Sequence, residues 1–318
     1  MTERIRVGAI ALFCMLALGG CSHVAGNVAD EGSYRAKRRT ELEALVAQPS
    51  SSTLTTAALL SFPPIDDAAQ PLELIQRAET MAPERPEIVW VQRFICERSR
   101  CGAAQLIENR LKELDPDNGF AWIPDLERAQ QAASDNAITE AIRHIGASKK
   151  MTVYFNSLEV TIFDALTVAT PRERLSTRAL EATGILAAQT IPPLQTLTRP
   201  CRADQFGLPG RREACQAMAT RMELSDTVLT QSLALSMQER WWPVNSAQRD
   251  SLRIKRRQLN YEMQMSGQLR WRMDHDMAIR IEAARKSERE EDVMLAVMKA
   301  YGIPLTAPSD WKDKRQSV

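Results

Sequence analysis

Residues 114–122 read LDPDNGFAW, and this stretch marks a junction between two helices. Before it, apolar residues recur at helical intervals at Ile107, Leu111 and Leu114. Pro116 then interrupts the helix, because proline lacks the backbone N–H that a helix interior needs. A second apolar series begins after Trp122. The stretch therefore predicts two successive helices joined by a short turn.

Helical periodicity extends over most of the chain on both sides of this junction. Helix start signals are Ser134-Asp135, Ser225-Asp226 and Asn245-Ser246, each placed before an apolar series. Residues 153–163 have the only marked strand propensity, and their spacing also suits a helix. Apolar stripes at helical spacing include Ala137/Ala141/Ile145, Leu175/Ala179/Ala182/Leu186, Leu229/Leu233/Met237/Trp241 and Leu269/Met273/Met277/Ile281/Ala284. We therefore expect an all-α protein built of helical hairpins.

Large aromatic residues recur in the middle of the chain. Trp90, Trp122 and Tyr154 are separated by 32 and 32 residues, and a proline precedes each tryptophan. Small residues follow Trp122, among them Ala129 and Ala137, where a second helix would pack closely. This pattern resembles the junction of a tetratricopeptide repeat over about residues 70–168.

The resemblance implies a solenoid of paired helices with a concave peptide-binding face. The Leu-Gly pair that usually follows the aromatic residue is replaced by Asp125-Leu126-Glu127. The first repeat carries Cys96 and Cys101 where small residues are usual, and the third loses the pattern after Leu158. The alternative is ordinary helical packing in which the spacing of 32 residues between the aromatic residues is a coincidence.

The N-terminus has the elements of an export signal. Arg4 and Arg6 precede the uncharged run from Val7 to Leu18, which is too short to span a bilayer of about 30 Å. The following Leu-Gly-Gly-Cys, ending at Cys21, resembles the lipobox of bacterial lipoproteins. That resemblance implies a signal peptide over residues 1–20, cleavage before Cys21 and acylation of its thiol. A buried N-terminal helix is the alternative.

The same resemblance implies a destination and a tether. Ser22 rather than aspartate follows the cysteine, which in this family favours the outer membrane. Residues 21–34 show little helical periodicity, so a flexible tether is expected there. The expected location is the outer membrane of a Gram-negative bacterium, held by lipid and facing the periplasm.

Four cysteines remain once Cys14 is removed with the signal peptide and Cys21 is acylated, and this even number fits an oxidising compartment. They form two local pairs, and proximity in the sequence predicts the disulfides Cys96–Cys101 and Cys201–Cys215. On an ideal helix the Cα atoms of the first pair would lie about 8–9 Å apart, whereas a disulfide needs about 4.4–6.8 Å. The chain should therefore turn within residues 97–100. A zinc or redox site is disfavoured because C-x₂-C spacing and nearby histidines are lacking.

Prolines suggest the division of the chain. They interrupt helices between residues 190 and 200, which predicts a boundary between a tetratricopeptide-like domain over 35–200 and a helical part over 201–303. The C-terminal part should contain two or three long helices over about 211–303. Residues 304–318 should form a frayed tail.

Composition and motifs favour binding over catalysis. The 41 Lys and Arg residues balance 40 Asp and Glu residues, which argues against a nucleic-acid partner. The chain lacks common nucleotide-binding and hydrolase motifs, and His144 is expected at the surface. His275 lies between Asp274 and Asp276, but adjacent residues on a helix point about 100° apart, so these three are not expected to bind a metal together. The basic, methionine-rich residues 249–286 suit either a partner surface or a long helix with a Met-rich core side.

The sequence therefore predicts a non-enzymatic lipoprotein that binds an envelope protein, with no cofactor and no metal site. Two alternatives stay open. The first is a hydrolase acting on peptidoglycan, which would need two carboxylates, or a carboxylate and a serine, converging in a deep pocket. The second is an inhibitor or immunity lipoprotein.

Overall fold

The computed structural model describes residues 28–62, 69–189, 194–268 and 273–313. Over these ranges the chain is helical and contains no strand, which confirms the all-α prediction. The strand-prone residues 153–163 lead into a helix, α9 (Phe155–Ala169), in keeping with their helical spacing. The predicted signal peptide and Cys21 lie outside the described residues.

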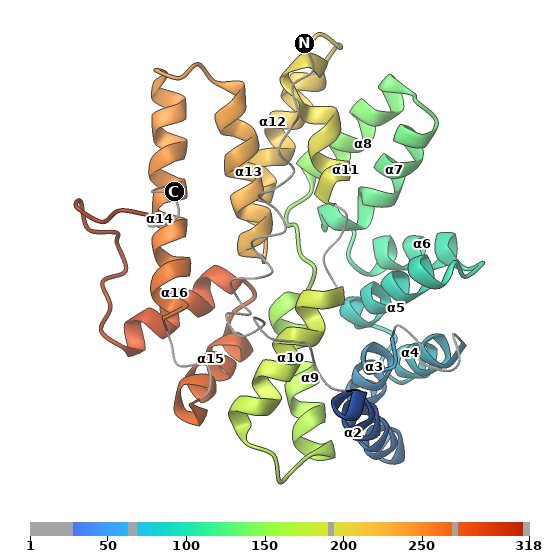
Figure 1. The fold of residues 1–318 in the computed structure, drawn as a ribbon. Helices are drawn as coiled ribbons and strands as arrows, with labels where there is room; N and C mark the ends of the chain where they lie inside the picture. Colours follow the sequence, from blue (N-terminus) through green and yellow to red (C-terminus); the bar gives the residue numbers. More distant parts are fainter. Residues whose placement is uncertain (1–27, 63–68, 190–193, 269–272, 314–318) are drawn as a thin grey trace.

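The helices form a closed circuit (Figure 1). The first half comprises α2 (Val28–Ala47), α3 (Ser51–Leu60), α4 (Ala69–Met81), α5 (Pro86–Ser99), α6 (Ala104–Leu114), η2 (Gly119–Trp122), α7 (Ile123–Gln131) and α8 (Asp135–Ala147). The second half comprises α9, α10 (Leu175–Gln189), α11 (Leu194–Thr198), η3 (Arg199–Cys201), η4 (Ala203–Gln205), α12 (Arg211–Met222), α13 (Val228–Trp241), α14 (Ala247–Ser266), α15 (Asp274–Lys286) and α16 (Glu290–Ala300).

Packing order departs from sequence order after α8. Helices α3 to α8 pack mainly against their neighbours in the chain, as expected of successive hairpins. However, α8 then packs against α12, while α9 returns to α3 and also contacts α15. The chain from α12 onward continues through α13, α14 and α16 to α15, which closes the circuit. Helical hairpins are thus present, and the tetratricopeptide resemblance itself stays a prediction.

The C-terminal part is more finely divided than expected. Over the described residues between 211 and 300 the chain forms α12 to α16, five helices rather than two or three. Two of these helices begin at polar caps, where an N-cap side chain satisfies free N–H groups at the helix start. The Thr227 side chain accepts from the Thr230 N–H at the start of α13, and Ser246 accepts from the Arg249 N–H at the start of α14.

A continuous hydrophobic core links the two predicted domains. It runs from Leu45 in α2 to Ile281 in α15 and includes buried residues on both sides of position 200. Trp90 packs against Phe120 with ring centroids 6.2 Å apart, and against Tyr154 at 6.3 Å. Burying a side chain of this size contributes about 1.5–3 kcal/mol, so the core ties the circuit together.

The N-termini of three helices, α9, α13 and α16, meet inside the circuit at Asp226. Its carboxylate accepts hydrogen bonds from the N–H groups of Val153 (3.0 Å to Oδ2) and Phe155 (3.0 Å), and from the Thr152 hydroxyl (2.8 Å). Burial raises the pKa of Asp226, although these donors act to lower it. The partial positive charge of helix N-termini also favours the ionised carboxylate, but burial has the larger effect.

Glu290 completes this junction of helix N-termini. Its Oε2 accepts from the Val228 N–H at the start of α13 (3.0 Å), and its own N–H donates to the Asp226 carbonyl (2.7 Å). The prediction that Ser225-Asp226 starts α13 was therefore wrong by one residue. Thr227 caps α13, and the Asp226 side chain serves α9 instead.

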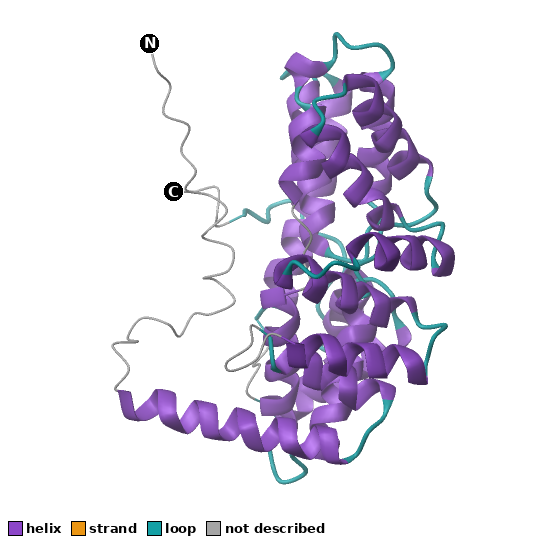
Figure 2. Ribbon diagram, turned by 90° about the vertical axis from the view of Figure 1, so that its right-hand side faces the viewer, coloured by secondary structure: helices purple, strands orange, loops and turns teal. Residues whose placement is uncertain are grey.

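The segment predicted as a flexible tether is helical at its end, because α2 begins at Val28. Figure 2 shows α2 running out from the body, and its residues 34–37 are exposed. An ion-pair cluster fixes its middle, since Lys37 Nζ lies 3.2 Å from a carboxylate oxygen of Glu41, 3.0 Å from Glu173 and 3.5 Å from Glu181. The three carboxylates lie close to one another, and the Lys37 ammonium group between them balances part of their negative charge.

Candidate functional site

The first predicted disulfide joins the end of α5 to the approach to α6. Cys96 and Cys101 are bonded, with Cα atoms 4.9 Å apart. The expected turn is confined to the end of the predicted segment, because α5 continues to Ser99. Arg100 adopts a left-handed conformation (φ 54°), and the Cys101 N–H then donates to the Cys96 carbonyl (3.0 Å). This bond staples the hinge between two helices.

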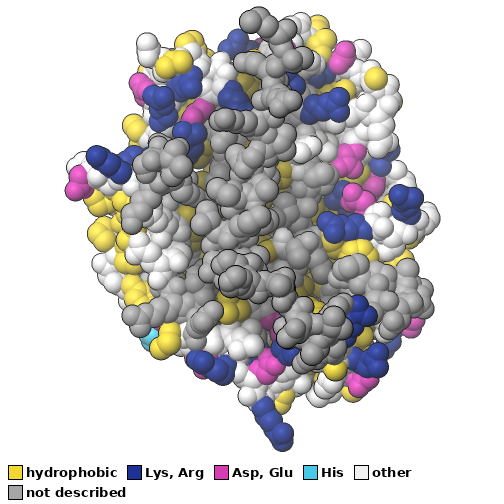
Figure 3. All heavy atoms as spheres, in the orientation of Figure 1, with side chains coloured by type: hydrophobic (Ala, Val, Ile, Leu, Met, Phe, Trp, Pro, Cys, Tyr) yellow, Lys and Arg dark blue, Asp and Glu magenta, His cyan; other side chains and the backbone are white. Residues whose placement is uncertain are grey.

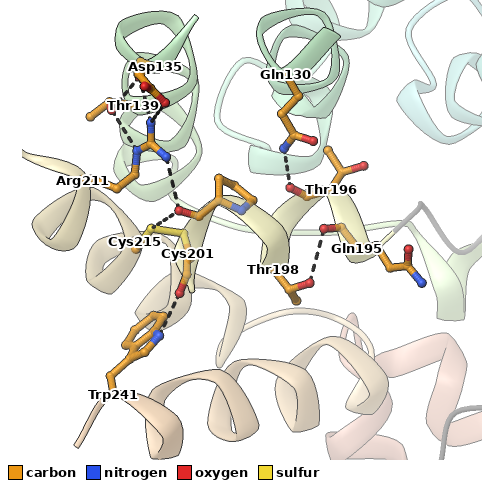
Figure 4. The surroundings of a disulfide bond; sticks show 11 residues. Gln130, Asp135, Thr139, Gln195, Thr196, Thr198, Cys201, Arg211, Cys215 and Trp241 are labelled. Atoms are coloured by element: carbon orange, nitrogen blue, oxygen red, sulfur yellow. Dashed lines mark hydrogen bonds and ion pairs between the residues drawn. A yellow bond between two sulfur atoms is a disulfide. The ribbon is translucent and has the colours of Figure 1, made fainter. Parts of the chain in front are cut away.

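The second predicted disulfide, Cys201–Cys215, joins η3 to α12 with a Cα separation of 5.5 Å. Figure 4 shows Arg211 beside it, with its guanidinium directed to α8. Arg211 donates to the Thr139 hydroxyl and the Asp135 carbonyl, both at 2.9 Å. Both cysteines are buried, so this bond belongs to the structural interior.

The cluster around this disulfide also reaches α13 and α11 (Figure 4). Trp241 Nε1 donates to the Cys201 carbonyl (2.9 Å), and Gln130 Nε2 of α7 donates to the Thr196 carbonyl (2.8 Å). The sequence places Trp241 in an apolar stripe but indicates no role for Arg211. A buried arginine next to a cysteine carries no distinctive sequence signal.

The repeated aromatic residues have two different environments. Trp90 and Tyr154 are buried together in the core. The Tyr154 hydroxyl donates to Asp115 Oδ2 (2.6 Å) and accepts from Asn118 Nδ2 (3.1 Å). Burial and the Asp115 carboxylate raise the pKa of Tyr154. Trp122, in contrast, is partly exposed and contacts neither of the other two rings.

Trp122 forms one wall of an open groove between α7 and α8. The groove has a volume of about 620 Å³, and three alanines line its floor: Ala129 and Ala141, which are buried, and Ala137, which is exposed. His144, which is exposed as predicted, stacks on Trp122 with ring centroids 4.9 Å apart and an interplanar angle of 10°. Trp122 thus presents a stacked pair of rings, rather than a bare ring face, to the side chains and main chain of another polypeptide.

Paired charges surround this groove, which we call the α7–α8 groove. Lys112 Nζ lies 4.6 Å from the centroid of the Trp122 ring and forms an ion pair with Asp125. Arg128 lies 2.6 Å from both Asp125 and Glu108. A cation against tryptophan holds the ring in place and is worth about 0.5–1 kcal/mol at an exposed site. The groove is thus pre-shaped by contacts among its own side chains.

Glu140, on the other side of the groove, pairs with Arg143. Its hydrogen bond to that guanidinium lowers the pKa of Glu140, so the carboxylate stays ionised at neutral pH. A general acid at neutral pH needs a raised pKa. This glutamate is therefore suited to recognition of a polar group rather than to proton transfer.

A second hollow of about 650 Å³ lies between α12, α13 and α14. Trp242 and Leu252 line it, and Lys255 lies 2.6 Å from Glu223 across it. Leu224 at its edge is an exposed large apolar residue. This hollow is also open and carries a balanced pair of charges.

Carboxyl groups with raised pKa are located elsewhere. Burial raises the pKa of Glu127, Asp226, Glu262 and Glu290, and none of these residues lines either hollow. An acid–base mechanism needs such groups to converge where a substrate can enter. Neither hollow brings together carboxyl groups of this kind.

The chain matches no protein-family model, no curated protein and no solved structure. Among the helices described, none combines the length and the apolar character that crossing a lipid bilayer requires. Acidic and basic side chains are interspersed over the described part of the face in Figure 3, in keeping with the balanced composition.

Proposed function

We propose that this protein is a lipoprotein anchored through Cys21 to the outer membrane, facing the periplasm, and that it binds another envelope protein without catalysing a reaction. The α7–α8 groove, with Trp122 stacked on His144, is the observation that carries the binding role. Tryptophan is enriched among residues that dominate binding energies at protein interfaces. The residues around Cys21 support the anchor.

The groove suits a polypeptide ligand for three reasons. Its alanine floor lets a partner's main chain approach closely, and its aromatic wall offers apolar area at low entropic cost. The paired charges of Asp125, Arg128 and Glu140 line the groove and can fix the register of polar groups on the partner. The tetratricopeptide resemblance agrees with a peptide-binding role.

The proposed anchor would hold the body close to the membrane. Residues 22–27 separate Cys21 from the first residue of α2. A segment of this length spans at most about 25 Å even when fully extended. Because α2 leads away from the body, it would act as a rigid spacer between the lipid and the α7–α8 groove. Two or three acyl chains would make this attachment effectively permanent.

The binding role is tested by placing a photo-crosslinking amino acid at Ala137 in growing cells. Ala137 is exposed on the groove floor, whereas the control position, Leu106 on α6, is 73% exposed and lies outside the groove. We expect one envelope protein to crosslink at Ala137 but not at Leu106. The same products at both positions would refute a specific groove.

Two variants then test the wall and the floor. Trp122→Ala removes the wall, and Ala137→Arg fills the groove from an exposed position that leaves the core intact. Each should lower the affinity for the crosslinked partner at least ten-fold, measured by titration calorimetry, with thermal melting of Ala137→Arg unchanged. Unchanged affinity in Ala137→Arg, or peptidoglycan turnover by the purified chain, would argue against the proposal.

The anchor is tested by Cys21→Ala. We expect the native protein to begin at residue 21, to incorporate labelled palmitate and to sediment with outer membranes. The variant should lose the label and leave the membrane fraction. A native chain that still begins at Met1 and carries no label would overturn the anchor but would leave the groove experiment valid.

A further inference from the structure

The C-terminal segment over residues 304–313 lies along α14 rather than fraying from it, so the prediction of a frayed tail was wrong for its described part. We call residues 304–313 the tail. Gln258 on α14 contacts its main chain twice, because Nε2 donates to the Leu305 carbonyl (2.7 Å) and Oε1 accepts from the Ala307 N–H (2.9 Å). The Tyr261 hydroxyl donates to the Pro304 carbonyl (2.8 Å).

Arg257 holds the second half of the tail. Its Nη2 lies within hydrogen-bond distance of the carbonyls of Pro308, Ser309 (3.3 Å) and Trp311 (2.9 Å), which share its two hydrogens. The Trp311 ring packs edge-on against Tyr261 with centroids 5.4 Å apart, and the Arg257 guanidinium carbon lies 5.5 Å from the Trp311 centroid. One aromatic side chain and several main-chain carbonyls are thus recognised together.

The tail adds little to the core. No residue of 304–313 belongs to the hydrophobic clusters of the described chain, and Pro304, Leu305 and Pro308 are exposed. The tail follows Gly302, whose positive φ of 63° forms a turn that directs the chain back along α14. Contacts aimed at main-chain atoms tolerate many sequences, so another extended chain can make the same bonds.

Asn260 Nδ2 also donates to Asp313 Oδ2 of the tail (2.8 Å). We propose that the α14 face formed by Arg257, Gln258, Asn260 and Tyr261 is a peptide-binding site that the tail occupies in cis. Its ligand in trans is an extended segment of another protein that carries a proline and, three residues later, a tryptophan, as Pro308 and Trp311 do in the tail. This site is separate from the α7–α8 groove and does not depend on the function proposed for that groove.

The tail, bound in cis, sets the affinity that a partner peptide needs in order to bind this face. A segment tethered by a short linker has an effective concentration of the order of millimolar, so it excludes weak ligands. A partner peptide binds only if it exceeds this competition, or if the tail is displaced. The hydrogen bonds of this face go mostly to main-chain atoms and distinguish little between sequences. Competition from the tail therefore makes the site selective for tightly binding peptides.

The test uses the full chain and a fluorescent peptide of residues 304–313. Trp311→Ala weakens the cis tail, so this variant should bind the peptide at least ten-fold more tightly than the unmodified chain in fluorescence anisotropy. Adding Arg257→Ala to Trp311→Ala should abolish binding. The matched addition of Arg253→Ala, an exposed arginine on the same helix that makes no contact with the tail, should not.

Each outcome decides the proposal. Binding that requires the tryptophan of the peptide and Arg257 of the chain supports it. Absence of binding to Trp311→Ala, or equal binding after Arg257→Ala in a variant that melts normally, overturns it. Light scattering of the unmodified chain over a concentration series tests whether the tail of a second copy occupies the α14 face. A dimer that Trp311→Ala abolishes would show that a second copy supplies the ligand and would overturn the choice of a different protein.

Discussion

Arg280 of α15 donates to Glu159 Oε1 of α9 over 2.9 Å, and both side chains are buried, with exposures of 8% and 0%. The Thr183 hydroxyl donates to the same carboxylate oxygen at 2.6 Å. Arg280→Met leaves the carboxylate buried without its cation, so we expect a loss of about 3–5 kcal/mol in the free energy of unfolding. Urea titration monitored by circular dichroism measures it.

A matched control comes from the same two helices. Arg285 pairs with Asp164, and these side chains are 38% and 46% exposed. Because exposed pairs are screened by water, Arg285→Met should cost at most about 1 kcal/mol. Arg280→Met combined with Glu159→Leu should recover part of the loss. Equal losses in the free energy of unfolding for Arg280→Met and Arg285→Met would show that burial of the Glu159 pair does not matter.

Asp226 should make stability depend on pH. Burial raises the pKa of this carboxyl above its ordinary value of 3.8, so the folded state binds the proton more readily than the unfolded state. The resulting contribution to stability is fully present below pH 3.8 and is lost as pH rises through the folded-state pKa. The stability advantage of the unmodified chain over Asp226→Asn should therefore shrink from pH 4 towards pH 7.

Urea titrations of both proteins at a series of pH values measure this difference. Glu290→Gln serves as a comparison, because desolvation also raises the pKa of that carboxyl at the same junction. An advantage that grows with pH would mean that the N–H donors of Val153 and Phe155 outweigh burial at Asp226.

Gly146 should resist even the smallest side chain. A Cβ there would lie 2.8 Å from the Met218 nitrogen and 2.9 Å from the Ala217 Cβ, where α8 crosses α12. Gly146→Ala should therefore cost about 1–3 kcal/mol through overpacking. Gly184 in α10 has nothing within 4 Å of the corresponding Cβ position, so Gly184→Ala should gain about 0.5–1 kcal/mol. Melting temperatures that move in the same direction would contradict the close approach of α8 and α12.

The two disulfides should differ in their contribution to the free energy of unfolding. The Cys201–Cys215 bond closes a sequence separation of 14 residues and the Cys96–Cys101 bond one of 5. Chain entropy assigns about 3 kcal/mol to the larger ring and about 2 kcal/mol to the smaller. The paired serine variants, compared by urea titration with and without reductant, measure both. Reaction of all four cysteines with a thiol reagent in the unreduced, denatured chain would exclude both bonds.

Local signals predicted the helices well. Ser134 and Ser246 are N-caps, as their positions before apolar series indicated. Capping involves atoms only a few residues apart, so the sequence contains the whole interaction. The two disulfides join cysteines that are close in the chain, and proximity was enough to pair them.

Interactions between distant residues were not predictable from one sequence. Glu159 and Arg280 are 121 residues apart, and Asp226 caps a helix that begins 71 residues earlier. In the α7–α8 groove, the alanines after Trp122 were expected to allow helices to pack closely. Ala129 and Ala141 are indeed buried in the core, whereas Ala137 is exposed in the groove, and Trp122 meets His144. The docking of the tail uses main-chain carbonyls, which leave no pattern in the sequence.

Because α9 packs against α3 on one side and α15 on the other, the beginning and the end of the molecule depend on a shared neighbour. A nascent chain that has emerged only as far as residue 200 lacks both α12, which covers α8, and α15, which covers α9. Its apolar surfaces stay open to aggregation until synthesis is nearly complete. Folding of this protein should therefore be largely post-translational, and chaperones that shield incomplete chains should raise its yield.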